Sequence, residues 1–530
     1  MSAERSSAPV RLGTGASDVR VEEADAAAPH RDGVVKKGLS AGSVGLLGSV
    51  VIGVAAVAPA NCASVTIGPA VVAVGKQVPA VLLLGAIPMI LVALGYRELN
   101  RAMPDAGTSF TWVARAFGPR LGWIVGWVLT VAMAIGFCNA AAAGVDFVYL
   151  VLAQIFAVPS LATLSHSLAI NLLTCLVILG ACAWVAYRGM TMTQAVQYVL
   201  VGTQLIVLIL FLIVVFSGAS SADGLPRHAV QLSWFNPLAV VSASALASGL
   251  SIAVFMFWGW EITLSLNEET LGARSTPGLA AWMTVVSTVI LFLLLSLACI
   301  SFAGLSGTGL GLTSPAVKSN VFVALSRPVF GPFAFLLSIA VLVSTISCVQ
   351  SLIMCPARTM LAMTVYGALP AVIGRVGRHR TPGIAILVST LGSWLAYSAV
   401  GLVSQNALGD TVTALAIMVC FYLSLTALAC VWYFRDQWFA SSHAFFMRFL
   451  FPLIGGAVLG ALFIKTIFDS MDPRYGSGSH LGPVGLVGVI GIGLILLGVV
   501  VMVIMNTISP AFFRGQTIWE GDGRCEALGD

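Results

Sequence analysis

Long apolar runs constrain the fold of this chain more than any other feature of its sequence. The first lies between Lys37 and Lys76, where 38 consecutive residues carry no charged side chain, and similar runs recur as far as residue 508. About 20 apolar residues form a helix long enough to cross the hydrocarbon core of a bilayer. The runs are continuous rather than alternating, so they indicate transmembrane helices and exclude a transmembrane β-barrel.

The composition leads to the same fold class. Of the 530 residues, 58% are hydrophobic and 9% are charged, whereas a soluble domain carries about 25% charged residues. We therefore predict an all-α polytopic membrane protein with 12 transmembrane helices. The expected spans are about 41–73, 79–99, 123–156, 166–187, 195–217, 239–267, 279–304, 329–364, 382–403, 411–434, 444–468 and 482–508.

Residue types that carry catalysis or bind metals are scattered along the chain. The ten cysteines form no CxxC pair, the six histidines are isolated, and the sequence contains neither an HExxH motif nor a GxxxxGK(S/T) motif. Metal sites and nucleotide-driven pumps depend on such patterns. We therefore expect no metal, no cofactor and no catalytic residue. The chain also has no basic patch with interleaved aromatic residues, which argues against a nucleic-acid partner.

Lysine and arginine indicate how the spans are oriented. If the N-terminus is cytoplasmic, 20 of the 26 Lys and Arg residues fall in the tails and inner loops, as the positive-inside rule requires. We predict a multi-pass protein of the plasma membrane with both termini in the cytoplasm. The outer segments then keep six cationic residues, which are Lys76, Arg227, Lys318, Arg327, Lys465 and Arg474.

Two of the predicted spans are too long for a straight helix. The run between Lys37 and Lys76 would extend about 57 Å, and residues 239–267 about 43 Å, while the hydrocarbon core is about 30 Å thick. Pro59 interrupts the first run because it has no N–H to donate, and Gly259 is a weak helix former in the other. Broken helices at matching positions of two halves indicate an inverted-repeat transporter. The alternative is a simple proline kink together with an ordinary helical glycine.

Three further motifs occur in order along the chain. GYRELNRAMPDAGTSFTWVARAFGPRLGWIVGW follows the second span, FWGWEITLSLNEET ends the sixth, and RTMLAMTVYGALP ends the eighth. Together they resemble the amino acid–polyamine–organocation (APC) transporter family over roughly residues 38–435. The resemblance implies a secondary active transporter (permease), not an enzyme, that moves an amino acid or a related small amine by alternating access.

The resemblance also implies a LeuT-like fold of two inverted halves of five helices, with two extra C-terminal helices. The implied organisation is a disordered cytoplasmic tail at 1–37, an inverted-repeat transport core at 38–435, peripheral helices at 436–508 and a cytoplasmic tail at 509–530. The substrate is expected between the breaks of spans one and six. The implied substrate-binding residues are Ala58, Pro59, Ala60, Asn61, Phe257, Trp258, Gly259, Trp260 and Glu261.

The sequence departs from the family pattern at three places. Pro59-Ala60-Asn61 stands where most members have Gly-Ser-Gly, Gln204 stands where proton-coupled relatives carry a lysine, and Val365-Tyr366 replaces an Arg-Asp pair. Gln204 has no charge to gain or lose, which argues against proton coupling through that residue. Some polyamine-type members also have a proline in span one, so a polyamine or organic amine importer or exchanger is the alternative. The lack of an acidic residue at 130–143 argues against it.

Ion coupling is open at this stage. Ser344, Thr345 and Ser347 offer hydroxyls that suit a sodium ion, or they simply bond the carbonyls of their own helix. Glu261 is interpreted as a brace for the broken helices, as a proton carrier, or as a ligand of the substrate amine, because a carboxylate within the membrane needs a partner. Trp258 and Trp260 are either interfacial anchors or walls of the site.

Some features remain undetermined by the sequence. Glu268 and Glu269, with Arg274, are interpreted as a solvated cytoplasmic face. An integral-membrane enzyme and a channel are lower alternatives, because neither a catalytic grouping nor a repeated filter element is present. The substrate, the choice among proton coupling, sodium coupling and exchange, the direction of transport and the oligomeric state stay open.

Overall fold

The computed structural model describes residues 37–218, 228–404, 406–473, 475–476 and 478–518. The predicted N-terminal tail lies outside these residues except for Lys37, and so does the end of the C-terminal tail. Within the described residues almost all regular structure is helical. The chain is therefore a multi-pass helical membrane protein.

Ten segments of the described residues are long and apolar enough to cross a membrane. Two of the predicted spans, 41–73 and 79–99, fall together in the first segment, Leu46–Ala102. The predicted span 239–267 is not among the ten, because its longest helix, Ala243–Met256, has only 14 residues. These two differences account for finding ten segments where twelve spans are predicted.

The first half of the chain contains helices α1 to α7. Their bounds are α1 Leu46–Val57, α2 Pro59–Val74, α3 Val78–Ala102, α4 Ser109–Phe117, α5 Pro119–Phe156, α6 Leu168–Tyr187 and α7 Met190–Ser217. Short 3-10 turns connect some of them, at η1 Gly75–Gln77 and η2 Pro159–His166.

The second half contains the remaining helices and one small hairpin. The helices are α8 Ala243–Met256, α9 Ile262–Ser265, α10 Thr276–Ala303, α11 Val321–Phe330, α12 Phe335–Leu352, α13 Met354–Val365, α14 Gly383–Val403, α15 Ala407–Tyr433, α16 Ser442–Ala444, α17 Phe451–Ser470, α18 Leu486–Ile508 and α19 Pro510–Phe513. Strands β1 His480–Leu481 and β2 Val484–Gly485 pair antiparallel. The 3-10 turns are η3 Leu232–Phe235, η4 Pro237–Ala239, η5 Asn267–Glu269, η6 Gly331–Phe333 and η7 Arg435–Gln437, and η8 Phe445–Leu450 is a π-helical turn.

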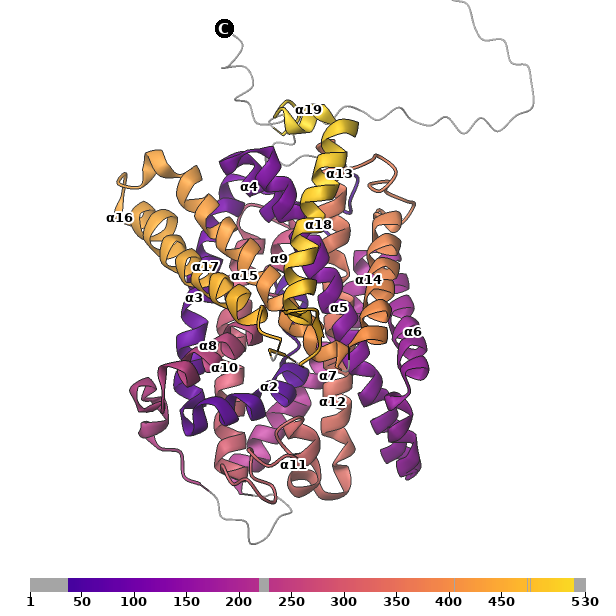
Figure 1. The fold of residues 1–530 in the computed structure, drawn as a ribbon, viewed down its shortest axis with the longest axis vertical. Helices are drawn as coiled ribbons and strands as arrows, with labels where there is room; N and C mark the ends of the chain where they lie inside the picture. Colours follow the sequence, from indigo (N-terminus) through magenta and orange to yellow (C-terminus); the bar gives the residue numbers. More distant parts are fainter. Residues whose placement is uncertain (1–36, 219–227, 405, 474, 477, 519–530) are drawn as a thin grey trace, which may run out of the picture.

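The helices form a bundle with central and peripheral members (Figure 1). Of the most apolar window of α15, 78% is buried, whereas the corresponding share is 17% for α6 and 22% for α14, α17 and α18. Helix α5 packs against α12, α4 and α15, and α3 packs against α10 and α8. The peripheral helices are therefore the ones that face the surrounding bilayer.

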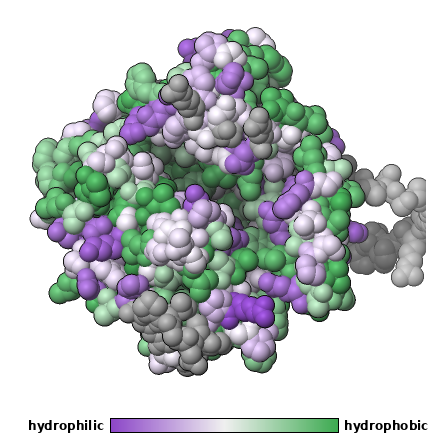
Figure 2. All heavy atoms as spheres, turned by 60° about the horizontal axis from the view of Figure 1, so that its bottom comes forward, coloured by the Kyte–Doolittle hydropathy of each residue, from purple (hydrophilic) through white to green (hydrophobic). Residues whose placement is uncertain are grey.

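The two ends of the bundle differ in the elements they carry. Helices α4, α13 and α19 lie at one end, and α11 lies at the other (Figure 1). Lys37 lies at the first end, because Asp105, between α3 and α4, bonds its ammonium group. We call these ends the Lys37 face and the α11 face. Figure 2, turned so that the α11 end comes forward, shows a hollow near the centre of that face.

The start of the described chain is fixed to the segment that follows α9. Val44 and Thr270 form a parallel bridge, in which the Val44 amide donates to the Glu269 carbonyl at 2.8 Å and the Leu271 amide donates to the Val44 carbonyl at 2.8 Å. This bridge joins residues more than 200 positions apart in the sequence. It brings Lys37 close to the acidic residues after α9.

Candidate functional site between two helix breaks

The first break separates α1 from α2 at Ala58. This residue has φ 51° and ψ 63°, a left-handed conformation that is unfavourable by about 1–2 kcal/mol for a non-glycine residue. Pro59 begins α2 at its first position, where the missing N–H removes no helical hydrogen bond. The predicted break is therefore present, and it lies one residue before Pro59.

The second break separates α8 from α9 over residues 257–261. Gly259 has φ 111°, a conformation that is open to glycine and strained for other residues. The Gly259 amide donates to the Oε2 atom of Glu261 at 3.2 Å, which satisfies one of the backbone groups that the break releases. The glycine that the sequence places between two tryptophans is thus required by the backbone.

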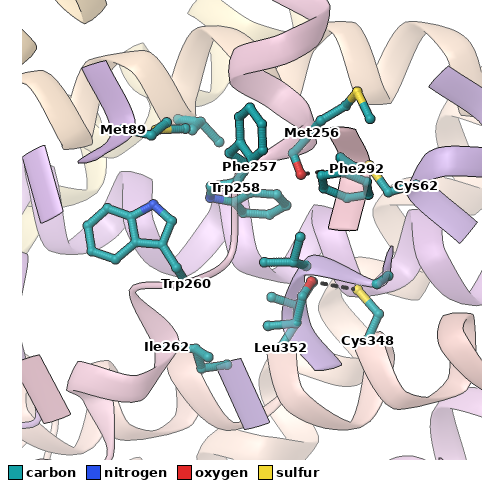
Figure 3. Close-up of a cluster of buried hydrophobic side chains, with 14 of the residues drawn as sticks. Cys62, Met89, Met256, Phe257, Trp258, Trp260, Ile262, Phe292, Cys348 and Leu352 are labelled. Carbon is teal, nitrogen blue, oxygen red and sulfur yellow. Dashed lines mark hydrogen bonds between the residues drawn. The ribbon is translucent and has the colours of Figure 1, made fainter. Parts of the chain in front are cut away.

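The two breaks lie against each other. A methyl group added to Gly259 would be 3.0 Å from the backbone carbon and oxygen of Ala56, near the end of α1. Cys62 of α2 donates its thiol to the carbonyl of Met256 at 3.8 Å, and Cys348 of α12 donates to the carbonyl of Ala56 at 3.2 Å (Figure 3). Released backbone at the two breaks therefore shares one buried space.

The two tryptophans beside Gly259 lie on opposite sides of the chain (Figure 3). Trp258 lies against α5, where a methyl group added to Gly136 would be 2.5 Å from its Cη2 atom. Trp260 is fully buried and packs edge-to-face on Tyr96, with ring centroids 5.1 Å apart. Because both indoles are buried within the bundle, neither one is an interfacial anchor.

Glu261 is held by a hydrogen-bonded chain that crosses from the second break to α15. The Trp258 indole donates to the Tyr422 hydroxyl at 2.6 Å, and that hydroxyl donates to Oε1 of Glu261. With the bond from Gly259, both carboxylate oxygens accept a hydrogen bond. Tyr422 was not singled out in the sequence, although a tyrosine in the middle of an apolar helix indicates a buried hydroxyl that needs a partner.

Asn61 connects the first break to α12. Its backbone amide donates to the Ser344 hydroxyl at 3.3 Å, while its side-chain oxygen is buried without a protein partner. Ala60, one residue earlier, is completely buried. The residues predicted from Ala58 to Asn61 therefore lie at the break, with one polar side-chain atom unsatisfied.

The three hydroxyls considered for sodium, those of Ser344, Thr345 and Ser347, have different hydrogen-bond partners. Thr345 donates to its own helix at the Val341 carbonyl and packs against Gly144 of α5. Ser347 donates to the Ser344 carbonyl at 2.8 Å and accepts a hydrogen bond from the Gln204 amide at 3.4 Å. Gln204 thus fills the space between α7 and α12 with a neutral amide.

The three motifs of the APC resemblance meet at the Lys37 face. The Lys37 ammonium bonds Oδ2 of Asp105 at 3.0 Å and also bonds Glu268, and its side chain is fully buried. The Tyr366 hydroxyl donates to the same Asp105 oxygen at 2.6 Å. We call Lys37, Asp105, Glu268 and Tyr366 the Lys37 network. Tyr366 is one of the two residues that replace the family Arg-Asp pair. Its hydroxyl makes it part of the Lys37 network.

Burial and charge shift the pKa values in this network. Burial alone would raise the pKa of Asp105, but the ammonium of Lys37 and the hydroxyl of Tyr366 outweigh it and lower the pKa below its ordinary value. For Glu268, burial prevails over the attraction of Lys37 and raises the pKa to about 7. Glu268 is therefore the member of the network that titrates near neutral pH.

The interpretation of Glu268 and Glu269 as a solvated face is wrong. The side chain of Glu268 is 6% exposed, and Glu269, which bonds Arg358 of α13 at 2.6 Å, is 1% exposed. Arg274, in contrast, is exposed. The acids are buried because Lys37 and Arg358 supply matching cations from distant parts of the chain, which the charge pattern alone does not reveal.

Comparison with known proteins identifies the family. The family model described as Amino acid permease matches residues 48–508. The chain belongs to the amino acid permease family. Proteins of this family are transporters and not enzymes, so the expected absence of enzymatic activity follows from the family.

Individual relatives of the permease are distant. The branched-chain amino acid permease BcaP of Lactococcus lactis is 24% identical over 60% of this chain and 68% of its own length. The gamma-aminobutyric acid permease of Escherichia coli is 25% identical over 83% of this chain and 89% of its own. The human Asc-type amino acid transporter 1 is 25% identical over 58% of this chain and 55% of its own.

Two cavities of the permease lie away from the breaks. One of about 700 Å³ lies between α6 and α14, and one of about 400 Å³ lies among α5, α14, α15 and α18. Neither is lined by a residue of the two breaks. Around the breaks, Phe257, Trp258 and Phe292 are instead packed in the core of the permease.

Proposed function

We propose that the permease carries an amino acid by alternating access, with the substrate bound between the breaks at Ala58 and at residues 257–261. The contact between Gly259 and the end of α1 carries this proposal, because two interrupted helices that face each other supply unpaired backbone groups at membrane depth. We further propose a LeuT-like arrangement of twelve helices, located in the plasma membrane, with the Lys37 face and both termini in the cytoplasm.

The breaks offer opposite partial charges to a zwitterion. The backbone amides of Ala60 and Asn61 lie in the first turn of α2, where the helix dipole favours a carboxylate. The Asn61 amide donates to the Ser344 hydroxyl in the present structure, and the carboxylate would replace that acceptor. The carbonyls of Ala56 and Met256 accept thiols in the present structure, and thiols are weak donors that an ammonium group would replace. Pro59 contributes no amide, so the binding of the carboxylate depends on the two residues after it.

The walls of the site favour an apolar side chain. Three aromatic side chains are buried beside the breaks, those of Phe257, Trp258 and Phe292. The ring centroids of Phe257 and Phe292 are 5.7 Å apart. Glu261 already accepts hydrogen bonds on both carboxylate oxygens, which leaves it poorly placed to hold a second amine. We therefore propose a neutral amino acid with an apolar side chain rather than a polyamine. BcaP, a relative named for branched-chain amino acids, supports this choice.

The conformation supports closure at one side. The Lys37 network and the Glu269–Arg358 pair tie together four separate parts of the chain at the Lys37 face, and the opposite face is hollowed (Figure 2). We propose that this network opens when the substrate is released toward the cytoplasm. The Ser347 hydroxyl already donates to the Ser344 carbonyl and accepts from the Gln204 side chain, so we propose no sodium ion there. We assign to Glu261 the role of a brace.

Uptake into liposomes tests the function directly. The purified protein, reconstituted in proteoliposomes, is expected to take up or exchange labelled leucine or valine, and to take up putrescine and glutamate far more slowly. Parallel assays with a pH gradient, a sodium gradient and internal unlabelled substrate separate proton coupling, sodium coupling and exchange. Absence of transport of every amino acid in the set would refute the proposal.

A further inference from the structure

The larger of the two cavities described above, about 700 Å³ in volume, lies between the peripheral helices α6 and α14 on the membrane-facing side of the bundle. Leu176 and Gly180 of α6 and Leu387 and Leu391 of α14 form its apolar walls. Along α6 the cavity extends from Leu176 to Tyr187, a distance of about 16 Å. This length is about half of the hydrocarbon thickness of roughly 30 Å. The cavity therefore has the depth of one leaflet.

A tight turn closes the end of the cavity at the Lys37 face. Arg375 lines the cavity, and the turn after it is anchored to α6, because Thr381 donates its hydroxyl to the Tyr187 carbonyl at 2.8 Å. The ring of His379 lies 5.2 Å from that of Tyr187. Arg380 has a left-handed φ of 55° within this turn. The strained turn keeps several cationic residues beside the mouth of the cavity.

The mouth is cationic without an acidic counterpart. Arg188, Arg375, Arg378 and Arg380 are all exposed, and in the described parts of the chain none of the four pairs with a carboxylate. Residues 147–222 and 270–409, which include both helices of the cavity, contain no aspartate or glutamate. Arg188 also lies over the half-exposed Trp184, at 5.3 Å from the ring, as residues at a membrane interface do.

We propose that this cavity binds an anionic phospholipid of the leaflet at the Lys37 face. The phosphate and the anionic headgroup contact Arg375, Arg378 and Arg380, and one acyl chain fills the cavity between α6 and α14. Charge complementarity at the mouth and an apolar channel of leaflet depth behind it select a lipid over a soluble anion. The site is separate from the breaks, so it does not depend on the proposed substrate site.

Native mass spectrometry of the full-length protein tests the headgroup contact. Detergent-solubilised protein is titrated with phosphatidylglycerol or with phosphatidylcholine of the same acyl chains. We expect a saturable adduct of one phosphatidylglycerol, retained on the order of tenfold more than phosphatidylcholine. The combined variant Arg375→Gln, Arg378→Gln, Arg380→Gln is expected to lose this preference. The variant Arg120→Gln, Arg435→Gln, Arg514→Gln, which removes the same number of exposed charges elsewhere, is expected to keep it.

A cavity-filling variant tests the acyl contact separately. A methyl group at Gly180 meets no atom within 4 Å, so the side chain of Gly180→Leu enters the cavity and should reduce retention of both lipids several-fold. Gly202→Leu, at a similarly open position of α7, is the matched control and should leave retention unchanged. A melting temperature close to that of the wild type, measured for each variant, shows that folding is preserved.

Several outcomes would overturn the proposal. Equal retention of the two lipids by the wild-type protein would show that the arginines do not select the headgroup. Retention unaffected by Gly180→Leu would indicate an anion held by the arginines alone. If the variant Arg375→Gln, Arg378→Gln, Arg380→Gln retains phosphatidylglycerol as the wild type does, residues other than these three arginines hold the headgroup.

Discussion

At the scale of single residues, the chain of hydrogen bonds from Trp258 through Tyr422 to Glu261 decides how the second break is held. Glu261 is 4% exposed and its carboxylate is bonded on both oxygens. Removing one partner of a buried polar group leaves the other unsatisfied, which costs more than the bond itself contributes. The hydrogen bonds that hold Glu261 are therefore sensitive to small changes at Tyr422.

Tyr422→Phe is expected to destabilise the protein by about 1–3 kcal/mol, because Glu261 loses a donor and the Trp258 indole loses an acceptor. Thermal unfolding in detergent measures this loss. Tyr433→Phe, at the end of the same helix, is the control, since its ring is partly exposed. Equal melting temperatures for the two variants would contradict the assigned brace.

Gly259→Ala tests the backbone of the break. The added methyl would lie 3.0 Å from the Ala56 backbone, and φ 111° is strained for alanine. We expect transport to fall at least tenfold, with a loss of stability of about 1 kcal/mol or more. Gly202→Ala is the control, because Gly202 lies within a helix and the added methyl group meets no atom within 4 Å. This variant should transport as the wild type does, and its stability should be unchanged or slightly higher. A Gly259→Ala variant with normal uptake would show that the break does not need glycine.

At the scale of elements, the Lys37 network holds the first of the described residues against the loop after α3, the segment after α9 and the end of α13. Lys37→Met leaves Asp105 and Glu268 without their cation, and breaking a buried ion pair in this way costs about 3–5 kcal/mol. Faster hydrogen exchange at the amides of Val44 and Leu271, which form the bridge beside the network, measures the loosening. Lys76→Met, at an exposed position, should leave these amides protected.

The pH dependence of stability follows from Glu268. Its pKa in the folded protein is raised to about 7, chiefly by burial, so between its ordinary pKa and pH 7 the folded state binds more protons than the unfolded state. Stability contributed by this group is therefore present at low pH and is lost as the pH rises through 7. The lowered pKa of Asp105 acts in the opposite direction, and its contribution is lost only below its ordinary pKa.

Melting temperatures between pH 5 and pH 8 test this sign. The wild-type protein should lose stability as the pH rises from 5 to 7, and Glu268→Gln should flatten that slope. Asp436→Asn, which removes an exposed acid, should retain it. A slope that persists in Glu268→Gln would assign the titration to another group.

At the scale of the whole molecule, substrate binding between α1, α2, α8 and α9 should couple to global stability. A ligand that binds only the folded state stabilises it by about 2.7 kcal/mol at a concentration 100 times its Kd. Leucine or valine should therefore raise the melting temperature in a concentration-dependent way, and putrescine should not. A shift with putrescine alone would reverse the proposed preference for neutral amino acids.

The sequence by itself determined the membrane class, the approximate spans and the two breaks. A chain with such long apolar runs cannot cover them with a soluble surface, so it must lie in a membrane. Pro59 indicates a break because it has no N–H to donate, and Gly259 indicates one because glycine adopts a positive φ readily. These constraints depend only on residues that are neighbours in the sequence, so the sequence alone is enough to predict them. The same holds for the family resemblance, whose three motifs the sequence displays in order.

The tertiary structure alone decided which distant residues meet. Tyr422 reaches Glu261 from 161 positions away, and Lys37 reaches Glu268 across 231 positions, so no local pattern predicts either contact. The acids after α9 read as solvated in the sequence because charge usually indicates exposure. They are buried because Lys37 and Arg358 supply matching cations, and a compensating charge is a property of the folded chain rather than of any segment within it.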